Sequence, residues 1–241
     1  MGSHLTAPLA RPPALRLPQT QTPAPSTSLL STSHLVSAAL RFGLRQAHVD
    51  DVLLALASPE AFWLLRDWRE KAFGNEEDLR RTLEGARSRI LAAARSGDEP
   101  SLRGVSVSVR PKGLWSTFHK AAVRKQQVHD VLALRVVVPS KDEEDCFEAL
   151  EALRRMYPAL VTDRFKDYVT TPKANGYRAL HEAFLLPDGH EMEIQLRTSE
   201  MHRDAEFGCA AHRQYKGPAA AFGAAIVSGL AHANRPLPHA A

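Results

Sequence analysis

The spacing of apolar residues changes from a helical to a strand period near residue 100. Between residues 50 and 95, apolar side chains recur every three or four positions, which predicts helices. Pro59 suits the first position of a helix, Asn75 suits a helix cap, and the sequence from Gly97 to Pro100 ends the region. The helices are expected at residues 50–57, 60–73 and 76–95.

From residue 101 onward the apolar pattern predicts strands. Val105, Val107 and Val109 alternate with other residues, and residues 131–138 are almost wholly apolar, as in an interior strand covered on both faces. The turn Pro187-Asp188-Gly189 predicts a hairpin. The expected order is strand, helix, strand, helix, polar loop, hairpin and helix, at residues 101–109, 113–125, 131–138, 141–156, 163–177, 178–197 and 199–216, the last capped by Ser199.

This order predicts an α/β fold in which helices cover the faces of a mixed sheet. We expect the helices at 50–95 to pack on the sheet as a cap, where they could also support a homo-oligomer. Residues 1–49 contain no acidic side chain and many Ser, Thr, Pro and Ala, which is typical of a disordered segment and equally of an organelle transit peptide. The first four residues are typical of a tag remnant. Four segments follow: this one, a helical region at 50–99, the sheet domain at 100–217 and a flexible tail at 218–241.

Composition narrows the class of protein. The 241 residues are 44% hydrophobic and 24% charged, with a formal net charge of +4, as in a folded globular chain. Cys146 and Cys209 are far apart and form no CxxC motif, so the sequence encodes neither a disulfide framework nor a zinc module. No apolar run reaches the roughly 18 to 20 residues of a membrane span. We therefore expect a soluble protein in a reducing compartment, without a membrane partner.

A group of cations follows the first strand. Lys112, Ser116 and Lys120 are four positions apart, which places them on one helix face, and Arg110 precedes them. Together with the backbone amides at the helix start, such a group could hold a polyphosphate. The alternative is a solvated basic face.

Two carboxylates accompany strands. Asp130 precedes the apolar run 131–138, and Glu193 lies between Met192 and Ile194. A carboxylate there is costly unless it meets a cation. Two of them beside a phosphate site could hold magnesium, which favours one or two protein carboxylates plus phosphate oxygens. The alternatives are a cap for Asp130 and a salt bridge from Glu193 to Arg135 or Arg197.

The loop at 163–178 combines cations and aromatic rings without periodicity. A ring beside cations suits a nucleotide, because the base stacks while the charges hold phosphate. Asn175 and Gly176 supply a turn that could present Tyr177 outward. The alternative is a mobile basic loop whose aromatic residues face the core.

Five sequence blocks resemble the synthetase domain of the RelA/SpoT alarmone synthetases. They are RPK at 110–112 with Ser116 and Lys120, HDVLALRVVV at 129–138, DRFKDYVTTPKANGYRALH at 163–181, EIQLRT at 193–198 and EMHRDAEFGCAAHRQYK at 200–216. They stand in family order and cover roughly residues 100–217, so the match is specific.

The resemblance implies a nucleotidyltransferase-like fold and transfer of the β,γ-pyrophosphate of ATP to the 3′-hydroxyl of GTP or GDP, releasing AMP. It also implies a role for each matching residue. Asp130 and Glu193 would share Mg²⁺, and Glu193 would activate the acceptor hydroxyl. ATP would lie against Arg110, Lys112, Ser116 and Lys120. The acceptor nucleotide would lie against Lys166, Lys173, Asn175, Tyr177, His181, Gln195 and Arg197, with Tyr177 stacked on guanine.

The resemblance also bounds the function. Family hydrolase domains carry a His-Asp metal motif ahead of the synthetase, and no complete one is found, so alarmone hydrolysis is not expected. Two alternatives are a relative that pyrophosphorylates an adenine nucleotide or the 3′ end of tRNA, and a non-catalytic nucleotide-binding module. We expect no DNA partner. The expected compartment is the cytoplasm, or the chloroplast stroma if the N-terminus is a transit peptide.

Overall fold

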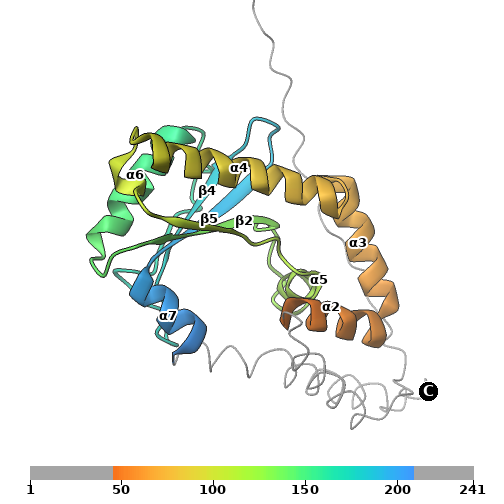
Figure 1. Cartoon of the computed structure of the whole chain (residues 1–241). Coiled ribbons are helices and arrows are strands. Elements are labelled where there is room, and N and C mark those ends of the chain that lie inside the picture. Colours follow the sequence, from red (N-terminus) through yellow and green to blue (C-terminus); the bar gives the residue numbers. More distant parts are fainter. Residues whose placement is uncertain (1–45, 209–241) are drawn as a thin grey trace, which may run out of the picture.

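A five-stranded mixed sheet organises the protein. The computed structural model describes residues 46–208, with strand order β1-β2-β5-β4-β3 (Figure 1). The neighbours β2 and β5 are parallel, and the other neighbouring pairs are antiparallel. The strands are β1 (Ser106–Val109), β2 (Leu132–Val138), β3 (Lys166–Asp167), β4 (Leu180–Leu185) and β5 (Glu191–Thr198). The expected α/β class with a mixed sheet is therefore confirmed.

Helices precede, connect and follow the strands. They are α2 (Gln46–Ala57), α3 (Pro59–Phe73), α4 (Glu76–Ser96), the short turn η1 (Pro100–Leu102), α5 (Leu114–Phe118), its π-helical continuation η2 (His119–Val123), α6 (Glu144–Met156) and α7 (Ser199–Phe207). Among the described residues, no helix is both long and apolar enough to cross a bilayer. The predicted tail at 218–241, nearly all of the segment 1–49 and the end of the last predicted helix lie outside the described residues.

Several predicted boundaries move. Helix α2 begins at Gln46, one turn before the expected start. The strand expected at 101–109 shortens to β1, because Pro100–Leu102 forms a helical turn. Helix α7 is capped by Thr198 rather than Ser199, since the Thr198 hydroxyl accepts from the Met201 amide. Asn75 does cap α4: its side chain accepts from the amides of Glu77 and Asp78.

One face of the sheet is apolar, and α4 and α6 cover it. Leu134 of β2, Ile194 of β5 and Phe184 of β4 are fully buried there, together with Leu83 of α4 and Leu150 of α6. Figure 1 shows α4 running along this side of the sheet, while α7 lies on the other side. The boundary expected near residue 100 is thus a turn within one shared core, and the expected packing of the N-terminal helices on the sheet is confirmed for α4.

A second, smaller core joins α2, α3 and α5. Leu54 of α2 and Leu65 of α3 are buried against Leu114 and Trp115 of α5. The tip of the β4–β5 hairpin meets the end of α3, where the His190 ring donates to the carbonyl of Ala72 at 2.9 Å. The N-terminal helices therefore contact the rest of the fold at three places: α4 on the sheet, α2 and α3 on α5, and the end of α3 at the hairpin.

Candidate active site

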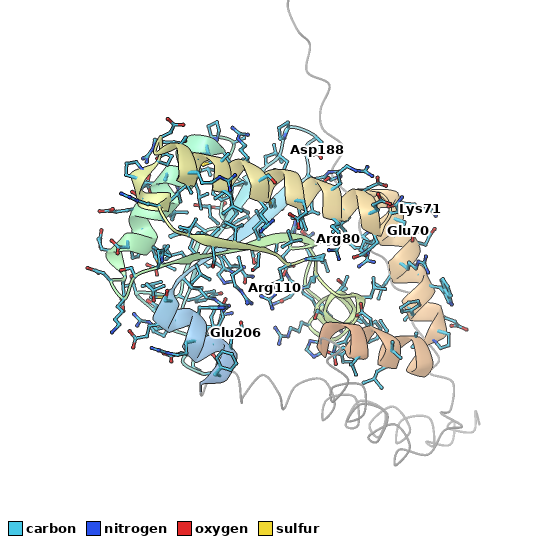
Figure 2. All side chains as sticks on the ribbon, viewed as in Figure 1. Glu70, Lys71, Arg80, Arg110, Asp188 and Glu206 are labelled. Atoms are coloured by element: carbon cyan, nitrogen blue, oxygen red, sulfur yellow. The ribbon has the colours of Figure 1, made fainter. Side chains whose placement is uncertain are left out.

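The second face of the sheet carries polar side chains in register. Lys166 of β3 pairs with His181 of β4, which pairs with Gln195 of β5, and Gln195 pairs with Arg135 of β2. Because side chains alternate along a strand, these residues form one row on the face opposite α4 and α6. Figure 2 shows Arg110 and Glu206, which belongs to α7, on this same side of the sheet.

Glu193 lies beside this row, between two small residues. Its strand neighbours are Ala133 of β2 and Ala183 of β4, so no large side chain flanks its carboxylate within the sheet. Oε1 of Glu193 accepts from the Gln195 amide at 2.9 Å and lies 3.2 Å from Nδ1 of His181. The alternative salt bridge to Arg135 or Arg197 is not formed.

The carboxylate of Glu193 is ionised although it is buried. Burial by itself would raise its pKa, but hydrogen bonding to His181 and Gln195 outweighs burial and lowers the pKa to about 2. The negative charge of Asp130 acts in the opposite direction on this pKa, which reflects the proximity of the two carboxylates. Glu193 can therefore accept a proton or bind a cation at neutral pH.

Asp130 is held by two of the predicted phosphate-binding lysines. Its oxygens accept from Nζ of Lys112 and Nζ of Lys120, each at 2.8 Å, rather than capping a helix or turn. Burial would raise the pKa of Asp130, but the two ammonium groups outweigh it and hold the pKa well below its usual range. Lys112, Lys120 and Asp130 thus form one charged cluster.

The other two residues predicted to bind ATP, Arg110 and Ser116, form no hydrogen bond to Asp130. Arg110 donates to the side-chain oxygen of Gln195 at 2.9 Å, so it reaches across the sheet toward Glu193. Ser116 is exposed on α5. The amide of Trp115 at the start of α5 already donates to Asp51 at 2.8 Å, so this amide is not open to a phosphate as the sequence pattern suggested.

Tyr177 is buried rather than presented outward. Tyr177 is only 6% exposed. Its hydroxyl lies 2.8 Å from Nε2 of His181 and 2.8 Å from the guanidinium of Arg197. The guanidinium of Arg197 lies 4.7 Å from the ring centre, and Nζ of Lys173 lies 4.8 Å from it. The ring is therefore buried and in contact with two cations, and the prediction that Tyr177 is presented outward is wrong.

The loop before Tyr177 is ordered by its own side chains. Oδ1 of Asn175 accepts from the Tyr177 amide at 3.2 Å, and Gly176 adopts a positive φ of 80°. Asn175 thus shapes the turn. Lys173 also lies 4.3 Å from the ring centre of Tyr168, which sequence reasoning left without a role. The ring of Tyr168 in turn contacts Tyr177 and His181 edge to face.

Arginines add positive charge to this face. Burial and repulsion from Arg197 and Arg110 lower the pKa of Arg135 to about 10. Nε of Arg135 and Nε of Arg197 are buried without a hydrogen-bond partner among the described residues, while Oε1 of Glu206 lies 2.8 Å from a terminal nitrogen of Arg135 and 3.6 Å from one of Arg197. Such groups suit an anionic ligand. The sequence analysis treated Arg135 only as a salt-bridge partner. A single cation in an otherwise apolar strand could have indicated that Arg135 faces the site.

The described residues contain no group of three or more His, Cys, Asp or Glu side chains that could hold a metal ion. Asp130 and Glu193 are nevertheless both ionised and electrostatically coupled, and two ammonium groups already balance the charge of Asp130. Two carboxylates fit Mg²⁺ only when phosphate oxygens complete its ligands. The donor set is therefore suited to a nucleotide-bound ion rather than a permanently held one.

Comparison with known proteins identifies this region. Residues 109–220 match the family model described as "Region found in RelA / SpoT proteins". A protein named "Probable GTP diphosphokinase RSH2, chloroplastic", from Oryza sativa subsp. japonica, is 44% identical over 114 residues, 46% of this chain and 16% of that protein. The GTP pyrophosphokinase of Escherichia coli strain K12 is 42% identical over 131 residues, 52% of this chain and 17% of that protein.

Among solved structures, the small alarmone synthetase 1 of Bacillus subtilis, bound to its product pppGpp, is similar at 20% identity. The TM-score is 0.46, and the match covers 63% of this chain and 86% of that one. The chain spans about a sixth of the length of the curated relatives named above.

Proposed function

Residues 109–220 of this chain belong to the RelA/SpoT family, and from that premise we propose that the protein is a GTP diphosphokinase. It transfers the β,γ-pyrophosphate of ATP to the 3′-hydroxyl of GTP or GDP, giving pppGpp or ppGpp and AMP. The names of the relatives support the reaction class, and the polar face of the sheet supports the placement of both substrates.

The observation that carries this proposal is the position of Glu193 between two groups of side chains. On its β2 side lie Lys112 and Asp130, since the Lys112 amide donates to the carbonyl of Val131 at the start of that strand. On its β4 side lies His181, which contacts both Glu193 and Tyr177. If the lysines bind the ATP phosphates and Tyr177 contacts the acceptor nucleotide, a carboxylate between them is placed to accept the proton of the ribose hydroxyl.

A secondary hydroxyl is a weak nucleophile, so the site must orient it and remove its proton. Glu193 is ionised and accepts that proton as the oxygen attacks the β-phosphorus. Lys112, Lys120 and the arginines of this face offset the negative charge on the transferred group. In this structure each lysine gives one hydrogen bond to Asp130, and an ammonium group has three N–H donors, so both lysines can contact phosphate oxygens while they hold Asp130.

Asp130 and Glu193 are the residues that would hold Mg²⁺ together with the ATP phosphates. When bound, the ion supplies charge neutralisation on the phosphates. Buried guanidinium nitrogens of Arg135 and Arg197 would meet phosphates of the acceptor nucleotide. Lys166, in the same row as His181, extends this positive surface at the sheet edge.

The experiment is incubation of the purified protein with magnesium and γ-labelled ATP, separately with GTP, GDP, ATP alone and deacylated tRNA, followed by chromatography of the products. Label on GTP or GDP that is lost in Asp130→Ala supports the proposal and ranks the acceptors. Label on tRNA or on an adenine nucleotide alone moves the function to the alternative acceptors. No transfer with any acceptor, in protein that binds ATP, favours the non-catalytic nucleotide-binding module.

We place this activity in the cytoplasm or, where residues 1–49 act as a transit peptide, in the chloroplast stroma. The acid-free N-terminal composition and the chloroplastic name of the rice relative support the stroma. Fusing residues 1–49 to a fluorescent protein decides between them: plastid import with cleavage supports the stroma, and diffuse cytosolic fluorescence supports the cytoplasm.

A further inference from the structure

Helix α5 carries part of the proposed ATP site but packs on the N-terminal helices. Its buried residues Leu114 and Trp115 belong to a core with Leu54 of α2 and Leu65 of α3, separate from the core under the sheet. Its spatial neighbours are α2 and α3 (Figure 1). The orientation of α5 therefore depends on the N-terminal helices.

A single carboxylate ties α2 to the start of α5. Oδ1 of Asp51 accepts from the amide of Trp115 at 2.8 Å, a contact between residues 64 positions apart. Gly113 is the cap residue of α5 and has no side chain to serve as a cap. A Cβ on Gly113 would lie 3.1 Å from Oδ1 of Asp51, so the glycine leaves the room that this carboxylate needs.

The two lysines of the cluster are held by different parts of the fold. The Lys112 amide donates to the carbonyl of Val131 at 3.0 Å, which fixes Lys112 to the sheet. Lys120 lies on η2, which continues α5, yet both lysines reach Asp130. Whether Lys120 and Lys112 converge on one site thus depends on how α5 is oriented against the sheet.

We propose that Asp51 is a positioning residue for the ATP-binding cluster. It holds α5 so that Lys120 and Ser116 face the same phosphates as Lys112, and it makes the N-terminal helical region part of the catalytic unit. The identity of the ligand as ATP rests on the proposed function, whereas the coupling of α2 to the lysine cluster rests on the contacts alone.

The test compares Asp51→Ala with two matched variants. Asp51→Asn keeps an oxygen that can accept from the Trp115 amide, and Asp67→Ala removes an exposed carboxylate of α3 that pairs only with Lys71 among the described side chains. We expect Asp51→Ala to raise KM for ATP about fivefold, the factor that corresponds to loss of one capping hydrogen bond. KM for GTP should stay near that of the wild type in all three variants. The melting temperature should fall by only a few degrees in Asp51→Ala, which loses the cap, and should stay near that of the wild type in the other two. Asp51→Asn should restore most of the ATP affinity.

A second readout does not need turnover. Binding of magnesium with α,β-methylene ATP is measured by calorimetry, and the Trp115 amide is followed by NMR in protein labelled with ¹⁵N-tryptophan. Asp51→Ala should weaken the analogue about fivefold and shift the Trp115 amide resonance upfield, as a lost hydrogen bond requires. If the wild type transfers no pyrophosphate, the proposed function fails, while the analogue affinities still decide the role of Asp51.

Three outcomes would overturn the proposal. One is an unchanged ATP affinity in Asp51→Ala. Another is a loss of affinity shared equally by ATP and GTP, which indicates a role in folding only. If Asp51→Ala does not fold, Gly113→Ala is the second variant, because its Cβ would lie 3.1 Å from Oδ1 of Asp51 and would require that carboxylate to shift by a few tenths of an ångström while its charge stays in place. A selective rise in KM for ATP supports the proposal, and no rise overturns it.

Discussion

Nδ1 of His181 lies 3.2 Å from Oε1 of Glu193, while Nε2 of the same ring meets the hydroxyl of Tyr177 at 2.8 Å. Burial lowers the pKa of His181, so the ring is neutral at pH 7 and carries one proton. A carboxylate only accepts, so that proton is on Nδ1, and Nε2 accepts from the Tyr177 hydroxyl. The hydroxyl in turn accepts from Arg197. One hydrogen-bonded chain thus joins the tyrosine to the carboxylate.

Replacing Glu193 by Gln should abolish transfer while leaving nucleotide binding largely intact. The amide keeps an oxygen for His181 but cannot accept the proton of the acceptor hydroxyl, so the rate should fall at least about 100-fold. Turnover is measured beside calorimetric binding of α,β-methylene ATP. Loss of folding in this variant would contradict a catalytic role for the residue.

Tyr177→Phe should cost stability more than acceptor binding. It leaves the buried Arg197 without its hydroxyl partner, so the free energy of unfolding should fall by about 1 to 3 kcal/mol. The ring remains, and KM for GTP should rise far less than in Tyr177→Leu, where loss of stacking is expected to raise it at least about fivefold. Urea unfolding and steady-state kinetics measure both. Equal KM values in the two variants would refute stacking on this ring.

Asp130→Asn should make stability less sensitive to acid. The folded pKa of Asp130 is below its ordinary value of 3.8, so ionisation stabilises the fold above that pH, and this contribution is lost as the pH falls through the folded pKa. At pH 7 the variant should unfold about 1.5 to 3 kcal/mol more easily than the wild type, and the difference should shrink below pH 4. Denaturant titrations of both proteins from pH 7 to pH 3 test this prediction, with Asp67→Asn at an exposed site as the control. A difference in unfolding free energy that stays constant over this pH range would contradict it.

The ion pair between the buried Glu182 of β4 and the partly exposed Arg154 of α6 should be sensitive to the loss of one partner. Glu182 is 2% exposed and accepts from Arg154 at 2.5 and 3.1 Å. Arg154→Met leaves the carboxylate without this cation and should destabilise by about 3 kcal/mol, whereas the double variant Arg154→Met with Glu182→Leu should recover most of the loss. Urea unfolding midpoints of the wild type, the two single variants and the double variant measure this double-mutant cycle. Additive losses in the double variant would show that the two residues do not act as a pair.

Local patterns were sufficient for many elements. The cap at Asn75, the hairpin turn after Leu186 and the apolar run of β2 depend on residues near each other in sequence, and each was predicted from that neighbourhood. The match of five motif blocks likewise selected Asp130 and Glu193 without knowledge of their surroundings.

The side chains that contact Glu193 could not be predicted from its sequence neighbours. A salt bridge to Arg197 and contact with His181 were both compatible with the position of Glu193, and the pairing of β4 with β5 decided for His181. The hydroxyl of Tyr177, a loop residue, also accepts from Arg197, which lies on β5.

The sequence by itself therefore determined the α/β class and the resemblance to the RelA/SpoT family, and it predicted the residues that we propose carry the chemistry, because periodicity, caps and motifs are local properties of the chain. Only the tertiary structure decided that Lys112 and Lys120 converge on Asp130, and that Asp51 of α2 holds the start of α5. These contacts join distant segments, and their geometry depends on strand register and helix packing, which no local pattern encodes.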